Sequence, residues 1–236
     1  MIATPSITAL VPVYNEIATV SDSVRKIHDF MRSLACTFEI LIIESGSSDG
    51  TAEACDLLAL QLSDVIVVHE GRRNGFGAAL RLGFAKATND LIWVVPVDLP
   101  YSLSLLQEGL RQIDDCDAVL SVRCSDDRSV FRRLQSHIYT WLCTLLLRQP
   151  GYSPNAAFKL YRRSVVLDLP LRSNGWFIDT EIAHRLRQRS SRLGIVAIDT
   201  VERSSGQSTV TTLDSWQMFK QLLAFRKILI DENKNR

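Results

Sequence analysis

Short, almost uninterrupted apolar segments alternate with helical patterns through the first half of this chain. The first two segments occupy residues 7–13 and 38–43, and a helical pattern follows each of them. Strands of this kind are typical of a sheet that is covered on both faces, because both sides of each strand are then buried. Regular β–α alternation with right-handed crossovers predicts an α/β fold, in which helices flank a mostly parallel, Rossmann-like sheet.

The predicted elements run along the whole chain and become less regular in its second half. Strands are predicted at residues 7–13, 38–43, 65–68, 91–95, 118–122, 156–161 and 195–201. Helices are predicted at residues 17–34, 49–62, 75–87, 102–113, 129–147, 176–189 and 213–230. No repeat or linker interrupts this order. We therefore expect a single domain at 1–212, divided into halves at 1–122 and 123–212 and followed by an amphipathic C-terminal helix and polar tail at 213–236.

A polar loop follows each of the first two strands. Tyr14, Asn15 and Glu16 follow the first strand, and the polar stretch 44–51 follows the second. Ligands of an open parallel sheet bind at the carboxyl ends of its strands, so both loops are expected to face one crevice. Small residues and acids at that position favour a nucleotide site, so we expect 1–122 to be the nucleotide-binding half of the domain and 123–212 the acceptor half. The candidate nucleotide-binding residues in these loops and before the third helix are Pro12, Tyr14, Glu16, Glu44 and Gly75.

Several of these positions also have a structural interpretation. Glu16 could contact ribose hydroxyls, or it could favour the positive N-terminus of the next helix. Asp49 fits an N-cap in a tight turn, which is mainly a structural role. Gly75 and Gly77 could let the backbone approach a phosphate at a helix N-terminus, or they could let that helix pack closely on the sheet.

Composition narrows the class of protein. Lys plus Arg (27) against Asp plus Glu (26) gives a net charge of +1, which does not favour a nucleic-acid partner. No apolar run reaches the 18 or so residues of a spanning helix, and no signal peptide is evident. Five widely spaced cysteines fit a reducing cytoplasm, and the four histidines show no zinc-site spacing. We expect a cytoplasmic location, with peripheral membrane contact as an alternative.

Six short motifs in order then resemble those of the family 2 glycosyltransferases of the GT-A fold. Among these enzymes, the chain is most similar to polyprenyl-phosphate sugar synthases of the dolichyl-phosphate mannose synthase type, over residues 7 to about 210. The motifs are Val11-Pro12-Val13-Tyr14-Asn15-Glu16, the loop from Glu44 to Thr51, Asn74-Gly75-Phe76-Gly77-Ala78-Ala79-Leu80, Val97-Asp98-Leu99, Ala157-Phe158-Lys159-Leu160-Tyr161 and Phe177-Ile178-Asp179-Thr180-Glu181.

The resemblance implies an inverting transferase that moves a sugar from a nucleoside diphosphate sugar to an acceptor, with polyprenyl phosphate as first choice. It places Glu44 at the nucleobase and Asp98 at the diphosphate, with Mg²⁺ or Mn²⁺. The metal motif is degenerate, because Pro96 and Pro100 stand where the family has a second acid and an amide, and Ser45 replaces another acid. Magnesium held by one carboxylate, phosphates and water is still compatible with this sequence. Two alternatives stay open: a nucleotide-sugar-binding homologue without transfer activity, and a metal-independent transferase that uses arginine.

The resemblance also implies an acceptor site in the second half. Arginine binds phosphate bidentately, so phosphate contacts are expected from Arg123, Arg132, Arg133, Ser136, Arg203 and Ser208. The alternative for these residues is a solvated surface. Asp98, Asp179 and Glu181 are the candidate catalytic acids. Asp179 could equally cap a helix.

The C-terminal helix mixes large apolar side chains with basic ones. Core packing or dimerisation is the more frequent fate of such a stripe, and docking in a membrane interface is the second interpretation.

Overall fold

The computed structural model describes residues 5–123, 130–147, 156–198 and 212–234, and at 123, 130–137, 212–218 and 233–234 it describes the backbone alone. In chain order, the elements are β1 (Ile7–Val13), α1 (Val20–Ser33), β2 (Phe38–Glu44), α2 (Thr51–Gln61), β3 (Val65–His69), α3 (Phe76–Lys86), β4 (Leu91–Val94), α4 (Leu105–Ile113), β5 (Ala118–Arg123), α5 (Val130–Leu147), β6 (Lys159–Arg162), α6 (Arg163–Leu167), α7 (Ile178–Gln188), β7 (Leu193–Ile198) and α8 (Thr212–Lys234).

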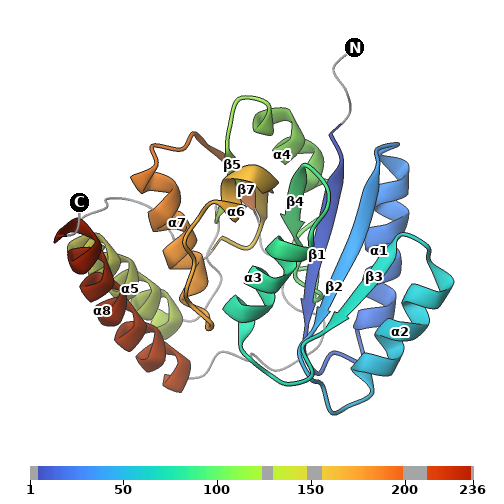
Figure 1. Ribbon diagram of the computed structural model, residues 1–236, viewed down its shortest axis with the longest axis horizontal. Coiled ribbons are helices and arrows are strands. Elements are labelled where there is room, and N and C mark those ends of the chain that lie inside the picture. The colour runs from blue at the N-terminus through green and yellow to red at the C-terminus, as the bar shows by residue number, and fades with distance from the viewer. Residues whose placement is uncertain (1–4, 124–129, 148–155, 199–211, 235–236) are drawn as a thin grey trace.

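The strands form one sheet in the order β3-β2-β1-β4-β6-β5-β7, flanked by helices (Figure 1). The pairs of β1 with β2 and β4, of β2 with β3, and of β5 with β7 are parallel. The predicted α/β fold with a mostly parallel sheet is therefore confirmed. The exception is β6, which runs antiparallel between β4 and β5 and is shorter than predicted.

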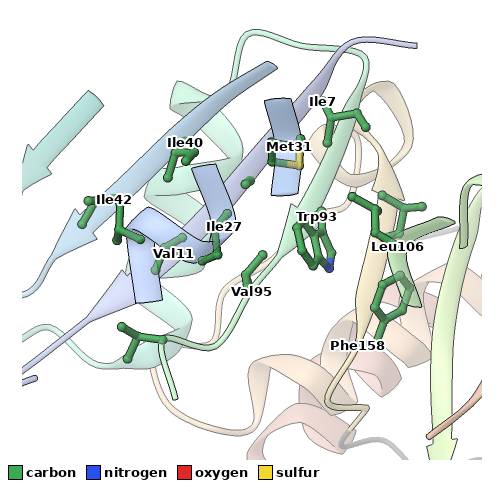
Figure 2. Close-up of a cluster of buried hydrophobic side chains, with 14 of the residues drawn as sticks. Ile7, Val11, Ile27, Met31, Ile40, Ile42, Trp93, Val95, Leu106 and Phe158 are labelled. Carbon is green, nitrogen blue, oxygen red and sulfur yellow. The ribbon is translucent and has the colours of Figure 1, made fainter. Parts of the chain in front are cut away.

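Alternating side chains of the strands build two cores, one on each face of the sheet. Val11 and Trp93 point to the face covered by α1, where Ile27 and Met31 lie (Figure 2). Leu10, Tyr161 and Ile182 lie in the core on the opposite face. Because both faces are covered, the strands are apolar almost throughout, as their sequence predicted.

Local backbone geometry explains why two helices begin later than predicted. The Glu16 carbonyl accepts hydrogen bonds from the N–H groups of Thr19 and Val20, so a turn precedes α1. Gly50 has φ +94°, in the left-handed region, and serves as the N-cap of α2. A helical pattern in the sequence includes such turns, because their polar residues fit the exposed face of either structure.

Helices α5 and α8, with Phe177 just before α7, form a third apolar cluster at the end of the molecule away from α1 and α2 (Figure 1). Leu222, Phe225 and Leu229 of α8 are buried there against Phe177 and Cys143. These side chains of α8 thus pack against the protein itself. The division into two halves and a tail remains a prediction. Within the described ranges, no helix is long and apolar enough to cross a membrane.

Candidate functional site

The loops that follow β1 and β2 lie together at the carboxyl ends of these strands, as predicted. The N–H of Asn15 donates to Ser47 Oγ at 3.0 Å, and the N–H of Ser48 donates back to Asn15 Oδ1 at 2.9 Å. The N–H of Glu16 donates to Thr51 Oγ1 at 2.8 Å. The two loops therefore form one polar structure at this edge of the sheet.

The structure places the residues predicted to bind the nucleotide in the first loop as follows. Pro12 is half-buried in β1, beside Ile43 of β2. The Tyr14 ring lies under the guanidinium of Arg73, which is 4.3 Å from the ring centroid. The Glu16 carboxylate accepts a hydrogen bond from Thr19 Oγ1 at 2.8 Å. Their nucleotide role stays a prediction.

Glu44 lies at the end of β2, and its carboxylate already has partners. Its side chain is buried, with 2% exposure for the residue. Oε1 accepts the N–H of Ser47 at 2.5 Å, and Oε2 lies 3.0 Å from His69 Nδ1. The other ring nitrogen of His69 lies 3.0 Å from Asp56 Oδ1. An imidazolium in this position donates to two carboxylates at once, so the pair links β2, β3 and α2.

These hydrogen bonds shift the pKa values of both partners in the directions that favour charge. Burial raises the pKa of Glu44, but the hydrogen bonds from His69 and Ser47 outweigh it, and the pKa lies below its usual value. The hydrogen bond to Glu44, with that to Asp56, raises the pKa of His69. The ionised pair is thus the form that the fold stabilises.

We expect the contribution of His69 to stability to fall as pH rises above 6.5, the usual pKa of histidine. A raised folded pKa gives stability that is complete below the unfolded value and is lost as pH passes the folded value. The His69→Gln substitution should therefore cost about 0.5 kcal/mol at pH 6, because the pair is partly exposed, and less at pH 8.5. Urea unfolding at both pH values measures this. Leu60→Ser, on the exposed face of α2, is the uncharged control, and an equal cost of His69→Gln at both values would contradict the assignment.

Asp49 binds its own turn and the neighbouring loop. Its Oδ1 accepts from the N–H of Thr51 at 3.1 Å and from Thr51 Oγ1 at 2.6 Å, and Oδ2 accepts the N–H of Ile17 at 3.2 Å. The structural role expected for Asp49 agrees with these contacts.

The glycine segment before α3 packs against the chain that precedes α7. Gly75 has φ +99°, and a side chain there would collide with the carbonyl oxygen of Asn174. The same oxygen accepts the N–H groups of Gly77 at 2.8 Å and Ala78 at 3.2 Å. Two of the N–H groups that the sequence offered to a phosphate are therefore satisfied within the chain. A nucleotide contact by Gly75 stays a prediction.

Asp98 sits in a tight turn directly beyond β4, at the same edge of the sheet. The N–H of Leu99 donates to the Pro96 carbonyl at 3.1 Å, and Leu99 has φ +42°. Asp98 is half-buried. No group of three His, Cys, Asp or Glu side chains that could hold a metal occurs in the described part of the chain. The residues thus supply a single carboxylate and do not form a complete protein metal site.

The two acids of α7 have different surroundings. Glu181 is fully buried, and its carboxylate accepts the N–H groups of Arg172 at 3.1 Å and Ser173 at 2.8 Å. Glu181 therefore fixes the backbone at Arg172 and Ser173. The carbonyl of the next residue, Asn174, accepts the N–H groups at the start of α3. Asp179 instead pairs with Lys159, with 2.8 Å between Nζ and Oδ2 and side-chain exposures of 7% and 10%. Burial raises the pKa of Asp179, and the Lys159 ammonium opposes that shift.

The predicted phosphate contacts rest on side chains that the structure does not describe. Arg123 ends β5, and Arg132, Arg133 and Ser136 lie on α5. Arg203 and Ser208 fall outside the described residues. The roles of all six remain predictions.

His69 and Lys159 are the two site residues that the sequence reasoning missed. His69 begins the polar stretch after β3, and Lys159 is a cation inside an apolar strand pattern. A charged residue in a buried strand signals a buried partner, because an unpaired interior charge is costly. That signal does not say which acid the partner is.

Comparison with known sequences covers the loops that follow β1, β2 and β4. The sequence model described as "Glycosyl transferase family 2" matches residues 8–169. Glycosyltransferase AglD of Haloferax volcanii is 28% identical over 203 residues, which cover 82% of this chain and 32% of that protein. An undecaprenyl-phosphate 4-deoxy-4-formamido-L-arabinose transferase of Salmonella choleraesuis is 29% identical over 163 residues, which cover 68% of this chain and 50% of that protein. The chain thus spans a third to a half of the length of these relatives.

Solved structures share the fold at low identity. Mannosyl-3-phosphoglycerate synthase of Rubrobacter xylanophilus has a TM-score of 0.76 at 18% identity, over 98% of this chain and 75% of that chain. Glucosyl-3-phosphoglycerate synthase of Mycobacterium tuberculosis, in complex with Mn²⁺, UDP and glucosyl-3-phosphoglycerate, has a TM-score of 0.73 at 18% identity, over 94% of this chain and 80% of that chain. The GT-A fold that the motifs implied is confirmed.

Proposed function

Because this chain belongs to glycosyl transferase family 2, we propose that it transfers a sugar from a nucleoside diphosphate sugar to a polyprenyl phosphate. The observation that carries the proposal is the family match over residues 8–169, which includes both interlocked loops and the Asp98 turn. The name of the Salmonella relative supports a polyprenyl phosphate acceptor. The UDP in the mycobacterial complex supports a nucleotide donor.

The donor would lie along the carboxyl ends of β1, β2 and β4. Tyr14 and Glu16 would contact its nucleoside. Glu44, at the end of β2, would lie near the base. The half-buried Asp98 would face the diphosphate and the sugar. This assignment rests on the rule that ligands of parallel sheets bind at the carboxyl ends of the strands, since all these residues lie at or beyond those ends.

The proposed transfer proceeds with inversion at the anomeric carbon. An oxygen of the acceptor phosphate attacks that carbon as the bond to the donor diphosphate breaks, and the nucleoside diphosphate departs with the bonding electron pair. A phosphate acceptor is already ionised, so no general base is needed. Arg132, Arg133 and Ser136 on α5, with Arg123, Arg203 and Ser208, would hold the acceptor phosphate.

A divalent cation, when bound, would neutralise the charge of the departing diphosphate. Asp98 is the one protein ligand proposed for it, and Pro96 and Pro100 supply no second side-chain donor. Magnesium commonly takes one or two carboxylates together with substrate phosphates. The cation would therefore enter with the donor.

Calorimetry and a transfer assay test this function. The chain should bind UDP or GDP with a dissociation constant that improves at least about 10-fold when Mn²⁺ is added, because a cation held by Asp98 would neutralise charge on the diphosphate. With a UDP- or GDP-sugar and undecaprenyl phosphate in detergent, mass spectrometry should detect the glycosyl-phosphate lipid. Metal-independent binding without turnover on any acceptor would instead indicate a nucleotide-sugar-binding homologue.

A further inference from the structure

Helix α5 exposes a stripe of large apolar side chains that the fold does not use. Trp141 is 62% exposed, Leu145 58% and Ile138 49%. Spacings of three and four residues place the three side chains along one face of the helix. The opposite face carries Tyr139, Leu142, Cys143 and Leu146, which pack in the cluster with Phe177 and α8. The exposed stripe therefore has no packing role in the described part of the protein.

The neighbouring helix adds basic charge to this end of the molecule. Helix α8 packs beside α5 (Figure 1). Among its described side chains, three exposed basic residues, Lys220, Arg226 and Lys227, outnumber one exposed acid, Asp231. The same helix exposes Leu223 and Ile230. The sequence of α5, Val130–Leu147, contains no acidic residue. A negatively charged surface in contact with α5 would therefore find exposed apolar side chains next to basic ones.

A second group of exposed leucines, on α2, shows what distinguishes the α5 face. Leu57 and Leu60 are 56% and 83% exposed, but the same helix also exposes the acids Glu53 and Asp56. Anionic lipid would be repelled there, whereas tryptophan, leucine and isoleucine beside basic residues are the composition of a helix that lies in a lipid interface.

We propose that the exposed face of α5, formed by Ile138, Trp141 and Leu145, docks on an anionic lipid surface beside the basic residues of α8. This inference deepens the proposed function, because a polyprenyl phosphate acceptor resides in such a surface and α5 also carries Arg132, Arg133 and Ser136. Docking would bring the helix that is proposed to hold the acceptor phosphate to the lipid. Apolar insertion would supply affinity, and charge would supply the preference for anionic headgroups.

Vesicle sedimentation tests the surface without substrate or turnover. The protein should bind phosphatidylglycerol/phosphatidylcholine vesicles more than pure phosphatidylcholine vesicles, and added salt should weaken binding by screening. The triple variant Ile138→Ser, Trp141→Ser, Leu145→Ser should lower the vesicle partition coefficient about 10-fold or more, because three apolar anchors are lost. The matched control Leu57→Ser, Leu60→Ser, on the far side of the molecule, should bind as the unmodified protein does.

A second measurement guards against misfolding of the triple variant. Brominated phosphatidylglycerol should quench part of the tryptophan fluorescence of the unmodified protein, and the single variant Trp141→Phe should lose that part. Failure of the unmodified protein to bind anionic vesicles would overturn the inference. So would a dimer in light scattering that the triple variant abolishes while vesicle binding persists, because the stripe would then be an interface between two copies.

A second acceptor distinguishes a failure of membrane docking from a failure of the proposed transfer reaction. Transfer to a water-soluble short-chain prenyl phosphate reports on the reaction without a membrane. The triple variant should keep that transfer and lose transfer to undecaprenyl phosphate in vesicles. Vesicle binding with no transfer to either acceptor would support the surface and contradict the reaction, and soluble transfer without vesicle binding would do the reverse.

Discussion

The Asp98→Asn substitution is expected to lower kcat/KM for sugar transfer by about 100-fold or more, because it removes the carboxylate that is proposed to hold the cation at the departing diphosphate. Asp98 lies in the turn closed by the Leu99-to-Pro96 hydrogen bond, directly beyond β4. The amide has nearly the same shape, so the turn should survive. Initial rates measured across a Mn²⁺ titration would quantify the loss and show whether affinity for the cation falls with it.

Asp90 is the matched control for Asp98, since it directly precedes β4, at the opposite edge of the sheet. Its carboxylate accepts a hydrogen bond from Ser6 Oγ at 2.8 Å, away from the proposed site. The Asp90→Asn variant should keep its transfer rate. Full activity of the Asp98→Asn variant would contradict the proposed role of Asp98 as a cation ligand. A large loss that is the same with and without Mn²⁺ would assign Asp98 to the sugar and leave the leaving group to arginine.

The second large effect concerns the buried pair of Lys159 and Asp179. Removing one partner leaves an uncompensated charge in the interior, so Asp179→Ala is expected to lower the free energy of unfolding by about 3–5 kcal/mol. The Lys159 ammonium lies 2.8 Å from Asp179 Oδ2 and 5.3 Å from the centroid of the Phe76 ring. Urea unfolding at neutral pH, followed by circular dichroism, measures the difference.

A double variant separates the ion pair from simple loss of packing. Lys159→Met combined with Asp179→Leu should recover most of the loss, because two apolar side chains leave no buried charge. Asp22→Ala, which breaks the exposed pair with Lys26 on α1, should cost no more than about 0.5 kcal/mol. Additive costs of the two single substitutions at Lys159 and Asp179 would show that the pair does not act as a unit.

The order of the elements was predictable because local patterns encode it. Continuous apolar runs identified β1 to β5, and a polar loop after β1 and β2 identified the edge where both loops lie. The direction of β6 was not predictable, because an apolar strand pattern is the same in either direction. Parallel or antiparallel pairing depends on which strands it lies between, here β4 and β5.

The sequence also did not predict which groups the acidic side chains bind. Glu44 and Glu181 both read as site carboxylates, yet the fold binds the first to His69 and the second to the backbone of Arg172 and Ser173. Asp179 read as a capping or catalytic acid, and the fold pairs it with Lys159, twenty positions away in the chain. Hydrogen bonding between distant positions leaves no local pattern.

By itself, the sequence determined the α/β architecture, the family and the edge of the sheet that carries the polar loops. Burial periodicity and residue types that recur at fixed positions are properties of short segments, and short segments can be read directly. Only the tertiary structure decided which polar groups of that edge are already satisfied within the chain. It also decided that the α8 side chains Leu222, Phe225 and Leu229 face inward while Trp141 of α5 faces outward. An apolar helix shows in its sequence that a face must be covered, but what covers that face depends on how distant elements pack.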